Sequence, residues 1–113
     1  MAVAKRAVRE VGSMLAEKRL PRWDNALEDA AQVSTILIVD DLDLNRRLLK
    51  AILKTEPYRI LEAKRPSLAL KQLEHEKVDL VVMDMVMPGM SGPDFCRALK
   101  ADRHTQLIPL LVI

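Results

Sequence analysis

The sequence predicts an α/β fold, a doubly wound parallel sheet with helices on both faces. Three observations predict it: short apolar runs, helical apolar spacing between these runs, and proline or glycine at the junctions. Runs and helices alternate from residue 35 onward, which is typical of βαβ units. Right-handed crossovers between parallel strands then place helices on both faces of the sheet.

Four apolar segments are the predicted strands. They are Thr35–Val39, Tyr58–Glu62, Val78–Met83 and Ile108–Ile113. The first contains four consecutive apolar residues, a pattern typical of a strand that is buried on both faces.

Three helices are predicted between these strands. The first ends at Glu56-Pro57, because the residue before a proline disfavours the α conformation. The second opens at Arg65-Pro66-Ser67, since proline is tolerated in a first helical turn, and the third spans Pro93–Ala101. The apolar residues that mark the helices are Leu44, Leu48, Ile52 and Leu53 in the first, Leu68 and Leu73 in the second, and Phe95, Ala98 and Leu99 in the third.

Residues 1–34 are predicted to form an N-terminal helical extension and linker ahead of a domain over residues 35–113. Apolar residues recur at helical spacing from Met1 to Leu20, and Pro21 ends the helix. Residues 1–22 carry six basic and two acidic side chains. Two interpretations stay open: a helix for a partner, a dimer or an upstream domain, and a helix that docks on its own domain. Trp23 is expected to be a packing anchor.

Composition excludes several classes of function. The chain has 113 residues with 18 basic and 16 acidic side chains, and it has no basic block of the kind that binds nucleic acid. Its single cysteine, Cys96, excludes an internal disulfide and fits a reducing compartment. No apolar run approaches the roughly 20 residues of a membrane span, and the N-terminus lacks the apolar core of a signal peptide. We therefore expect a cytoplasmic protein without membrane contact.

Three aspartates stand at the ends of predicted strands. Asp40 and Asp41 end the first strand and Asp84 ends the third. Sites in doubly wound sheets form at the carboxyl ends of strands, so neighbouring strands would bring these carboxylates together. A divalent cation relieves the repulsion among crowded carboxylates, and hard oxygen ligands suit Mg²⁺. The other interpretation, helix capping and turn formation, stays open.

Asp84 is the best candidate nucleophile, because it stands alone at the tip of its strand before a loop shaped by Pro88 and Gly89. An aspartate can attack a phosphoryl group and form an aspartyl phosphate. Such chemistry depends on positioning and charge neutralisation more than on acid–base catalysis. Asp40 and Asp41 would then hold the metal.

The segments "ILIVDDLDLNRRLLKAIL", "DLVVMDMVMPGMSGPDFCRALK" and "IPLLVI" resemble the receiver domain of two-component response regulators over residues 35–113. The resemblance implies a flavodoxin-like fold and a phosphoryl group passed from a sensor histidine kinase to Asp84 with Mg²⁺. It also implies that Asp41, Asp84 and the backbone carbonyl of Val86 contact the metal, with Asp40 acting mainly through water.

Members of this family carry a Thr or Ser after the fourth strand and a Lys after the fifth, and the sequence stops at Ile113 before both. We therefore expect an N-terminal piece of a longer regulator, or a chain completed by another chain. An output domain or protein partner beyond residue 113 and a homodimer are further expectations. Competence for phosphorylation without these two residues is left open.

Two other functions compete. A pseudo-receiver would use the fold only for protein contacts, although the three aspartates argue against it. A phosphohydrolase with an aspartate nucleophile typically carries a second Asp two residues later, where this chain has Val86. The first hypothesis is therefore a signalling module and not an enzyme.

A few polar residues remain. Arg46 and Arg47 are expected on an exposed helix face; the alternative is that they screen the acidic pair or meet the kinase. Asn45 is expected near the site or as a cap. His75 and His104 are expected to be solvated, and Cys96 to be buried or half-buried.

Overall fold

The computed structural model describes residue 6, residues 9–14 and residues 33–113. Its centre is a sheet of four parallel strands in the order β2-β1-β3-β4. The strands are β1 (Thr35–Val39), β2 (Arg59–Ala63), β3 (Leu80–Met83) and β4 (Leu110–Val112). The order agrees with that of flavodoxin-like doubly wound sheets, so the predicted fold class is confirmed.

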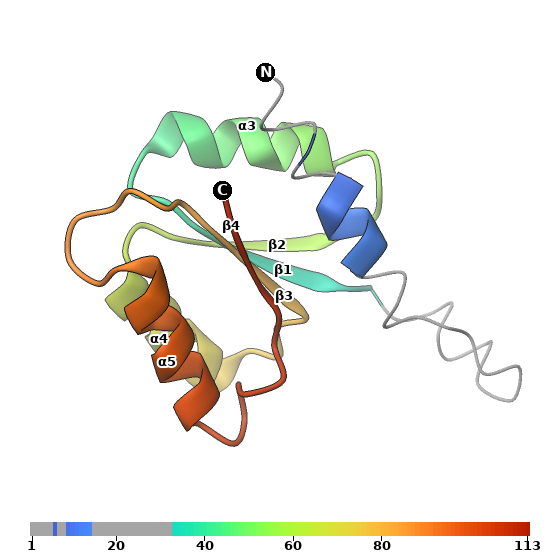
Figure 1. Ribbon diagram of the computed structural model, residues 1–113. Helices are drawn as coiled ribbons and strands as arrows, with labels where there is room; N and C mark the ends of the chain where they lie inside the picture. Colours follow the sequence, from blue (N-terminus) through green and yellow to red (C-terminus); the bar gives the residue numbers. More distant parts are fainter. Residues whose placement is uncertain (1–5, 7–8, 15–32) are drawn as a thin grey trace, which may run out of the picture.

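Helices cover both faces of the sheet (Figure 1). They are α3 (Asp43–Leu53), α4 (Pro66–His75) and α5 (Gly92–Ala101). α3 lies on one face, and α4 and α5 lie together on the other. Among the residues described, no helix has both the length and the apolar character needed to cross a membrane.

The strand order reverses at one point near the centre of the sheet. β1 lies between β2 and β3, with Ile36 paired to Leu80 and Val39 to Met83. The chain passes from β1 through α3 to β2 on one side, and then returns through α4 to β3 on the other. Strand order therefore reverses between β1 and β3, and ligands of such folds bind at the carboxyl ends of the strands at this point.

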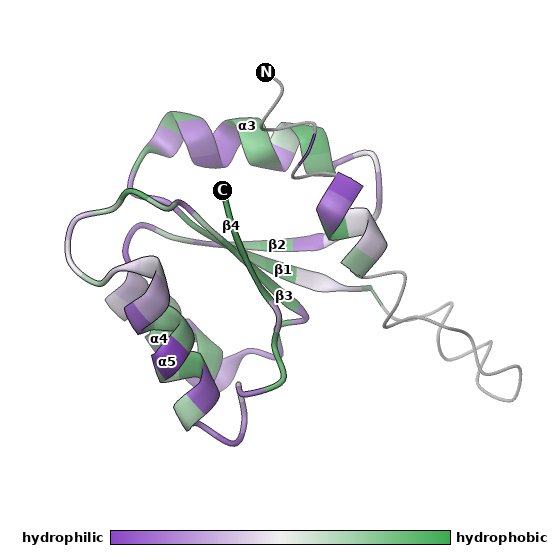
Figure 2. Cartoon of the chain, in the orientation of Figure 1, coloured by the Kyte–Doolittle hydropathy of each residue, from purple (hydrophilic) through white to green (hydrophobic). Residues whose placement is uncertain are grey.

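The core has two layers, one on each face of the sheet. Successive side chains of a strand point to opposite faces, so β1 contributes Leu37 and Val39 to the layer under α4 and α5. Ile36 and Ile38 join the layer under α3. The strands are accordingly hydrophobic along most of their length, whereas the helices carry hydrophilic residues on their outer sides (Figure 2).

The described part of the N-terminal extension belongs to the second layer. Residues 9–14 are helical, and Val11 is only 1% exposed among the side chains that pack between the sheet and α3. Met14 is partly buried against the same cluster. The extension thus contacts the sheet at these residues, while Trp23 and most of the predicted linker lie outside the described residues.

Two details of α3 differ from expectation. Leu44, one of the apolar residues that mark this helix in the sequence, is 69% exposed, and Arg46, predicted on an exposed face, is only 4% exposed. The buried positions of α3 are Arg46, Leu49 and Leu53, which share one helical face at steps of three and four residues. The expectation for Arg46 was wrong because its guanidinium finds acceptors in three places: the residue after β1, the first turn of α3, and β2.

Candidate functional site

The structure brings the three strand-end aspartates together. Asp40, Asp41 and Asp84 each offer a carboxylate oxygen within 4.8 Å of the others. Asp40 is buried, Asp84 is half-buried and Asp41 is exposed, so the cluster opens to solvent on one side. The predicted convergence is confirmed, whereas the roles of the individual residues stay predictions.

Backbone hydrogen bonds carry the sheet one residue beyond its strands and so place two of these aspartates. The N–H of Asp40 donates to the carbonyl of Ala63, 3.1 Å away, and the N–H of Asp84 donates to the carbonyl of Val39, also at 3.1 Å. Both residues therefore leave the sheet at the same level. Their positions follow from strand pairing and not from flexible loops.

The same local turn follows Asp40 and Asp84. Oδ1 of Asp40 accepts from the N–H of Leu42 at 2.9 Å, and Oδ1 of Asp84 accepts from the N–H of Val86 at 3.1 Å. Turns of this kind, from an Asp side chain to the backbone two residues on, orient the carboxylate. Each carboxylate keeps a second oxygen with lone pairs for a ligand.

The electrostatics of the cluster favour binding of a cation. Burial raises the pKa of Asp40, and the neighbouring carboxylates of Asp84 and Asp41 raise it further. Hydrogen bonds from the Leu42 N–H and the Asn45 side chain act in the opposite direction. Burial and the neighbouring carboxylates thus disfavour the ionised form of Asp40, and a bound cation would stabilise that form.

The oxygen donors of the cluster fit Mg²⁺, which takes one or two carboxylates and completes its octahedron with water. Val86, whose carbonyl is a predicted ligand, lies in the loop after β3 with its side chain 80% exposed. No carboxylate stands at this position, so the general acid typical of aspartate-nucleophile phosphohydrolases is missing there.

A cleft of about 440 Å³ adjoins the cluster. Its lining combines one acidic residue, two basic residues and three residues of the β3–α5 loop; they are Asp41, Lys64, Arg65, Met87, Pro88 and Gly89. Gly89 has φ of 95°, a left-handed conformation that favours glycine. The cleft therefore presents two cationic side chains beside the carboxylates, a setting suited to an anionic ligand.

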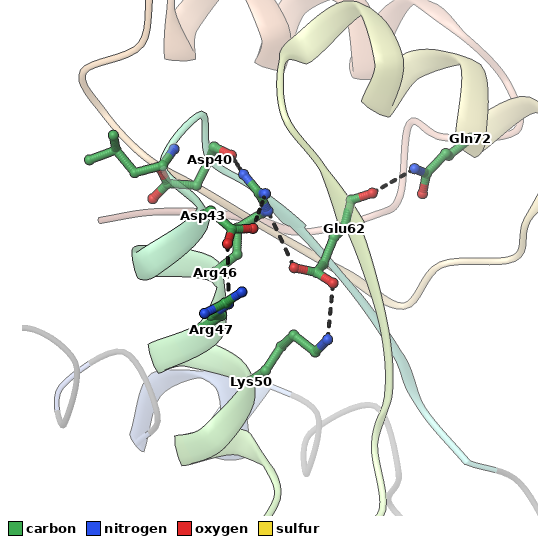
Figure 3. Close-up of polar contacts among 8 residues, drawn as sticks. Asp40, Asp43, Arg46, Arg47, Lys50, Glu62 and Gln72 are labelled. Carbon is green, nitrogen blue, oxygen red and sulfur yellow. Dashed lines mark hydrogen bonds and ion pairs between the residues drawn. The ribbon is translucent and has the colours of Figure 1, made fainter.

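Arg46 lies beside Asp40, although sequence reasoning placed it in solvent (Figure 3). Its Nη1 donates to the backbone carbonyl of Asp40 at 2.7 Å, and its other nitrogens bond to Asp43 and Glu62. One signal could have found it: Arg46 precedes Leu49 by three residues and Leu53 by seven, so it falls on their helical stripe. Arg47, in contrast, is exposed as expected.

The remaining expectations concern residues away from the cluster. His75 and His104 are exposed as predicted and line a separate cleft of about 470 Å³. Cys96 is half-buried on α5, also as predicted. Neither histidine nor the cysteine is among the residues that the structure brings to the aspartate cluster.

Comparisons with known proteins agree with this arrangement. The model of the family described as "Response regulator receiver domain" matches residues 36–113. Response regulator PleD of Caulobacter vibrioides is 41% identical over 78 residues, which are 69% of this chain and 17% of PleD. Protein PilH of Pseudomonas aeruginosa is 35% identical over 72% of this chain and 67% of its own length. The chain thus spans a minor part of PleD and about two thirds of PilH.

Solved structures show the same fold. The N-terminal domain of a response regulator receiver protein from Methanoculleus marisnigri superimposes with a TM-score of 0.67 at 31% identity, covering 72% of this chain and 66% of that one. A putative response regulator from Chloroflexus aurantiacus superimposes with a TM-score of 0.68 at 28% identity, covering 72% of this chain and 66% of that one. The four parallel strands and their helices are therefore an arrangement that this chain shares with receiver proteins.

Proposed function

Because the chain belongs to the response regulator receiver domain family, we propose that it accepts a phosphoryl group from a sensor histidine kinase on the carboxylate of Asp84. The observation that carries the proposal is the convergence of Asp40, Asp41 and Asp84 within 4.8 Å at the switch point of the sheet. The domain would act as a signalling module rather than as a turnover enzyme.

In the proposed step, a carboxylate oxygen of Asp84 bonds to phosphorus while the bond from phosphorus to the donor's leaving group breaks. The leaving group keeps the electron pair and takes a proton, which for a phosphohistidine yields neutral imidazole. Asp84 is suited to this role because the strand ladder and the bond from Val86 fix its carboxylate before the donor arrives.

Mg²⁺, when bound, would neutralise negative charge on the carboxylates and on the transferring phosphoryl group. Asp41, Asp84 and the carbonyl of Val86 would hold it, with Asp40 acting mainly through water. Lys64 and Arg65 line the adjoining cleft and would attract the anionic donor.

The phosphoryl group of the aspartyl phosphate carries about −1.5 to −2 charges near neutral pH, in place of the single negative charge of the free Asp84 carboxylate. Such a charge biases the surface around the site and so alters contacts with other proteins. We propose an output domain or a protein partner as the receiver of this signal, a homodimer as one form of contact, and the cytoplasm as the location.

The test is the intact mass of the 113-residue chain after incubation with acetyl phosphate and MgCl₂. We expect a gain of one phosphoryl group that is absent when EDTA replaces MgCl₂ in the incubation and absent in the Asp84→Asn variant. The matched control is Asp102→Asn, which removes a carboxylate just after α5 and should label like the wild type. Absence of any gain in a folded wild-type chain would contradict the proposal for these 113 residues.

A further inference from the structure

A buried arginine, Arg46, contacts the backbone of the aspartate cluster. The side chain of Arg46 is 5% exposed, and burial of a charge is costly unless the charge is paired and hydrogen-bonded. Arginine is always protonated in proteins, so its neighbours must satisfy the charge at every pH. The hydrogen-bond partners of Arg46 therefore indicate the role of this side chain.

The three partners of Arg46 come from three separate places in the fold. Nη1 donates to the backbone carbonyl of Asp40 at the end of β1 at 2.7 Å. Nη2 donates to Oδ1 of Asp43 in the first turn of α3 at 2.8 Å, and Nε donates to Oε1 of Glu62 in β2 at 3.2 Å. The planar guanidinium offers donors in fixed directions, so it holds these three groups in one relative arrangement.

Glu62 is anchored in turn from both sides of the sheet (Figure 3). Its Oε2 accepts from Nζ of Lys50 on α3 at 3.0 Å. Its backbone carbonyl accepts from Nε2 of Gln72 on α4 at 2.7 Å. The acceptor that fixes Nε of Arg46 is thus itself fixed, and the network reaches from α4 to the carbonyl of Asp40.

We propose that Arg46 is a positioning residue for phosphoryl transfer to Asp84. The carbonyl that Arg46 binds belongs to the peptide between Asp40 and Asp41, so fixing it orients the turn that carries both carboxylates. This inference rests on the proposed function. In it, the Arg46 guanidinium affects the reaction indirectly, by orienting Asp40 and Asp41. A lysine at this position keeps the charge but cannot bond to three separate groups in fixed directions.

Electrostatics and positioning predict opposite signs for the loss of Arg46. A positive charge close to a cation site repels the cation, so its removal by charge alone would tighten Mg²⁺ binding. If Arg46 orients the carboxylates, its removal weakens Mg²⁺ binding despite the relief of repulsion. The sign of the change in affinity therefore separates the two explanations.

The experiment is a calorimetric titration of the 113-residue chain with MgCl₂ alone, at a temperature at which each variant is folded. The variants are Arg46→Lys and Arg46→Gln, with Arg47→Lys and Arg47→Gln as matched controls. Arg47 is the adjacent arginine, 76% exposed and paired to the other oxygen of Asp43. We expect both Arg46 variants to weaken Mg²⁺ binding by about 10- to 100-fold, the range found for groups that orient metal ligands, and the Arg47 variants to stay within twofold of wild type.

A second measurement is independent of metal and of phosphorylation. The N–H of Leu42 donates to Oδ1 of Asp40, so its hydrogen exchange, followed by NMR without metal, reports order in the turn. We expect faster exchange at Leu42 in Arg46→Lys than in Arg47→Lys, and an intermediate rate in Glu62→Gln, which removes the charge of one of the three acceptors.

The outcomes separate the two proposals. Unchanged or tighter Mg²⁺ binding in the Arg46 variants overturns the positioning role, and so does unchanged exchange at Leu42. If the wild-type chain neither binds Mg²⁺ nor takes up a phosphoryl group, the proposed function fails, while the exchange rates still decide whether Arg46 orders the turn.

Discussion

The backbone N–H of Asp84 lies 3.1 Å from the carbonyl oxygen of Val39, to which it donates the last hydrogen bond that β3 makes to β1. This bond stands directly ahead of the carboxylates, since Val39 is followed by Asp40 and is paired with Met83. The backbone separation of Asp40 and Asp84 is thereby set by the spacing of adjacent strands, about 4.8 Å in any sheet. The cluster is accordingly part of the sheet's own geometry.

Mg²⁺ should stabilise the folded chain. At a Mg²⁺ concentration about 100 times the dissociation constant, the free energy of unfolding should rise by about 2.7 kcal/mol, because the metal binds only the folded cluster. Urea unfolding with MgCl₂ or with EDTA measures this change. The Asp41→Asn variant should lose most of the rise and Asp102→Asn should keep it. An equal rise in both variants would show that Mg²⁺ binds elsewhere.

Asp40 should make the metal-free protein less stable as the pH rises through the native pKa of this residue. Burial, assisted by Asp84 and Asp41, raises that pKa, so the native state binds more protons than the unfolded state just above the ordinary range of aspartate. Urea unfolding in EDTA from about pH 4 to pH 7 should show wild type losing stability relative to Asp40→Asn, followed by a plateau. A difference that is flat, or that grows in favour of wild type, contradicts this sign.

Gly89→Ala should destabilise the protein by about 1–2 kcal/mol. The cost comes from the backbone alone, because φ is 95° and a Cβ atom at this position would meet no atom within 4 Å. The control is Gly92→Ala at the start of α5, where a Cβ atom would make ordinary contact with Val112 at 3.9 Å. That variant should be neutral or more stable by up to about 1 kcal/mol. Equal effects of the two substitutions would contradict the explanation that the positive φ of Gly89 causes the loss of stability.

Val11→Ala should cost about 2 kcal/mol of unfolding free energy, since two methyl groups leave a fully buried site next to the sheet. Ser13→Ala is the matched control, because Ser13 is exposed on the same helical segment. Thermal or urea unfolding of both variants decides whether the extension contributes to the stability of the fold. No difference between the two variants would mean that the contact of Val11 is not maintained in solution.

The sequence predicted best what depends on local pattern and on general rules for parallel sheets. The bounds of β1 agree with the prediction, because a run of apolar residues ends abruptly at Asp40. The meeting of Asp40 with Asp84 followed from the rule that parallel strands present their carboxyl ends at one edge. Neither result required knowledge of a side-chain contact.

Arg46 shows why the rest could not be predicted. A charged residue is assigned to the surface by default, and burial becomes favourable only through acceptors that the fold brings in from elsewhere. One of them, Glu62, lies 16 residues further along the chain. The burial of Val11 was likewise left open, because a thin apolar stripe on a helix does not indicate which surface the helix packs against.

The burial of Val11 against the sheet has a consequence for modularity. The family model that matches this chain begins at residue 36, inside the first strand. A transplanted domain that started at Thr35 would lack Val11, which belongs to the same buried cluster as Ile36 and Leu80. Exposed apolar surface of this kind promotes association with other chains. The unit that can be moved intact therefore begins upstream of the sheet, at the helix that seals it.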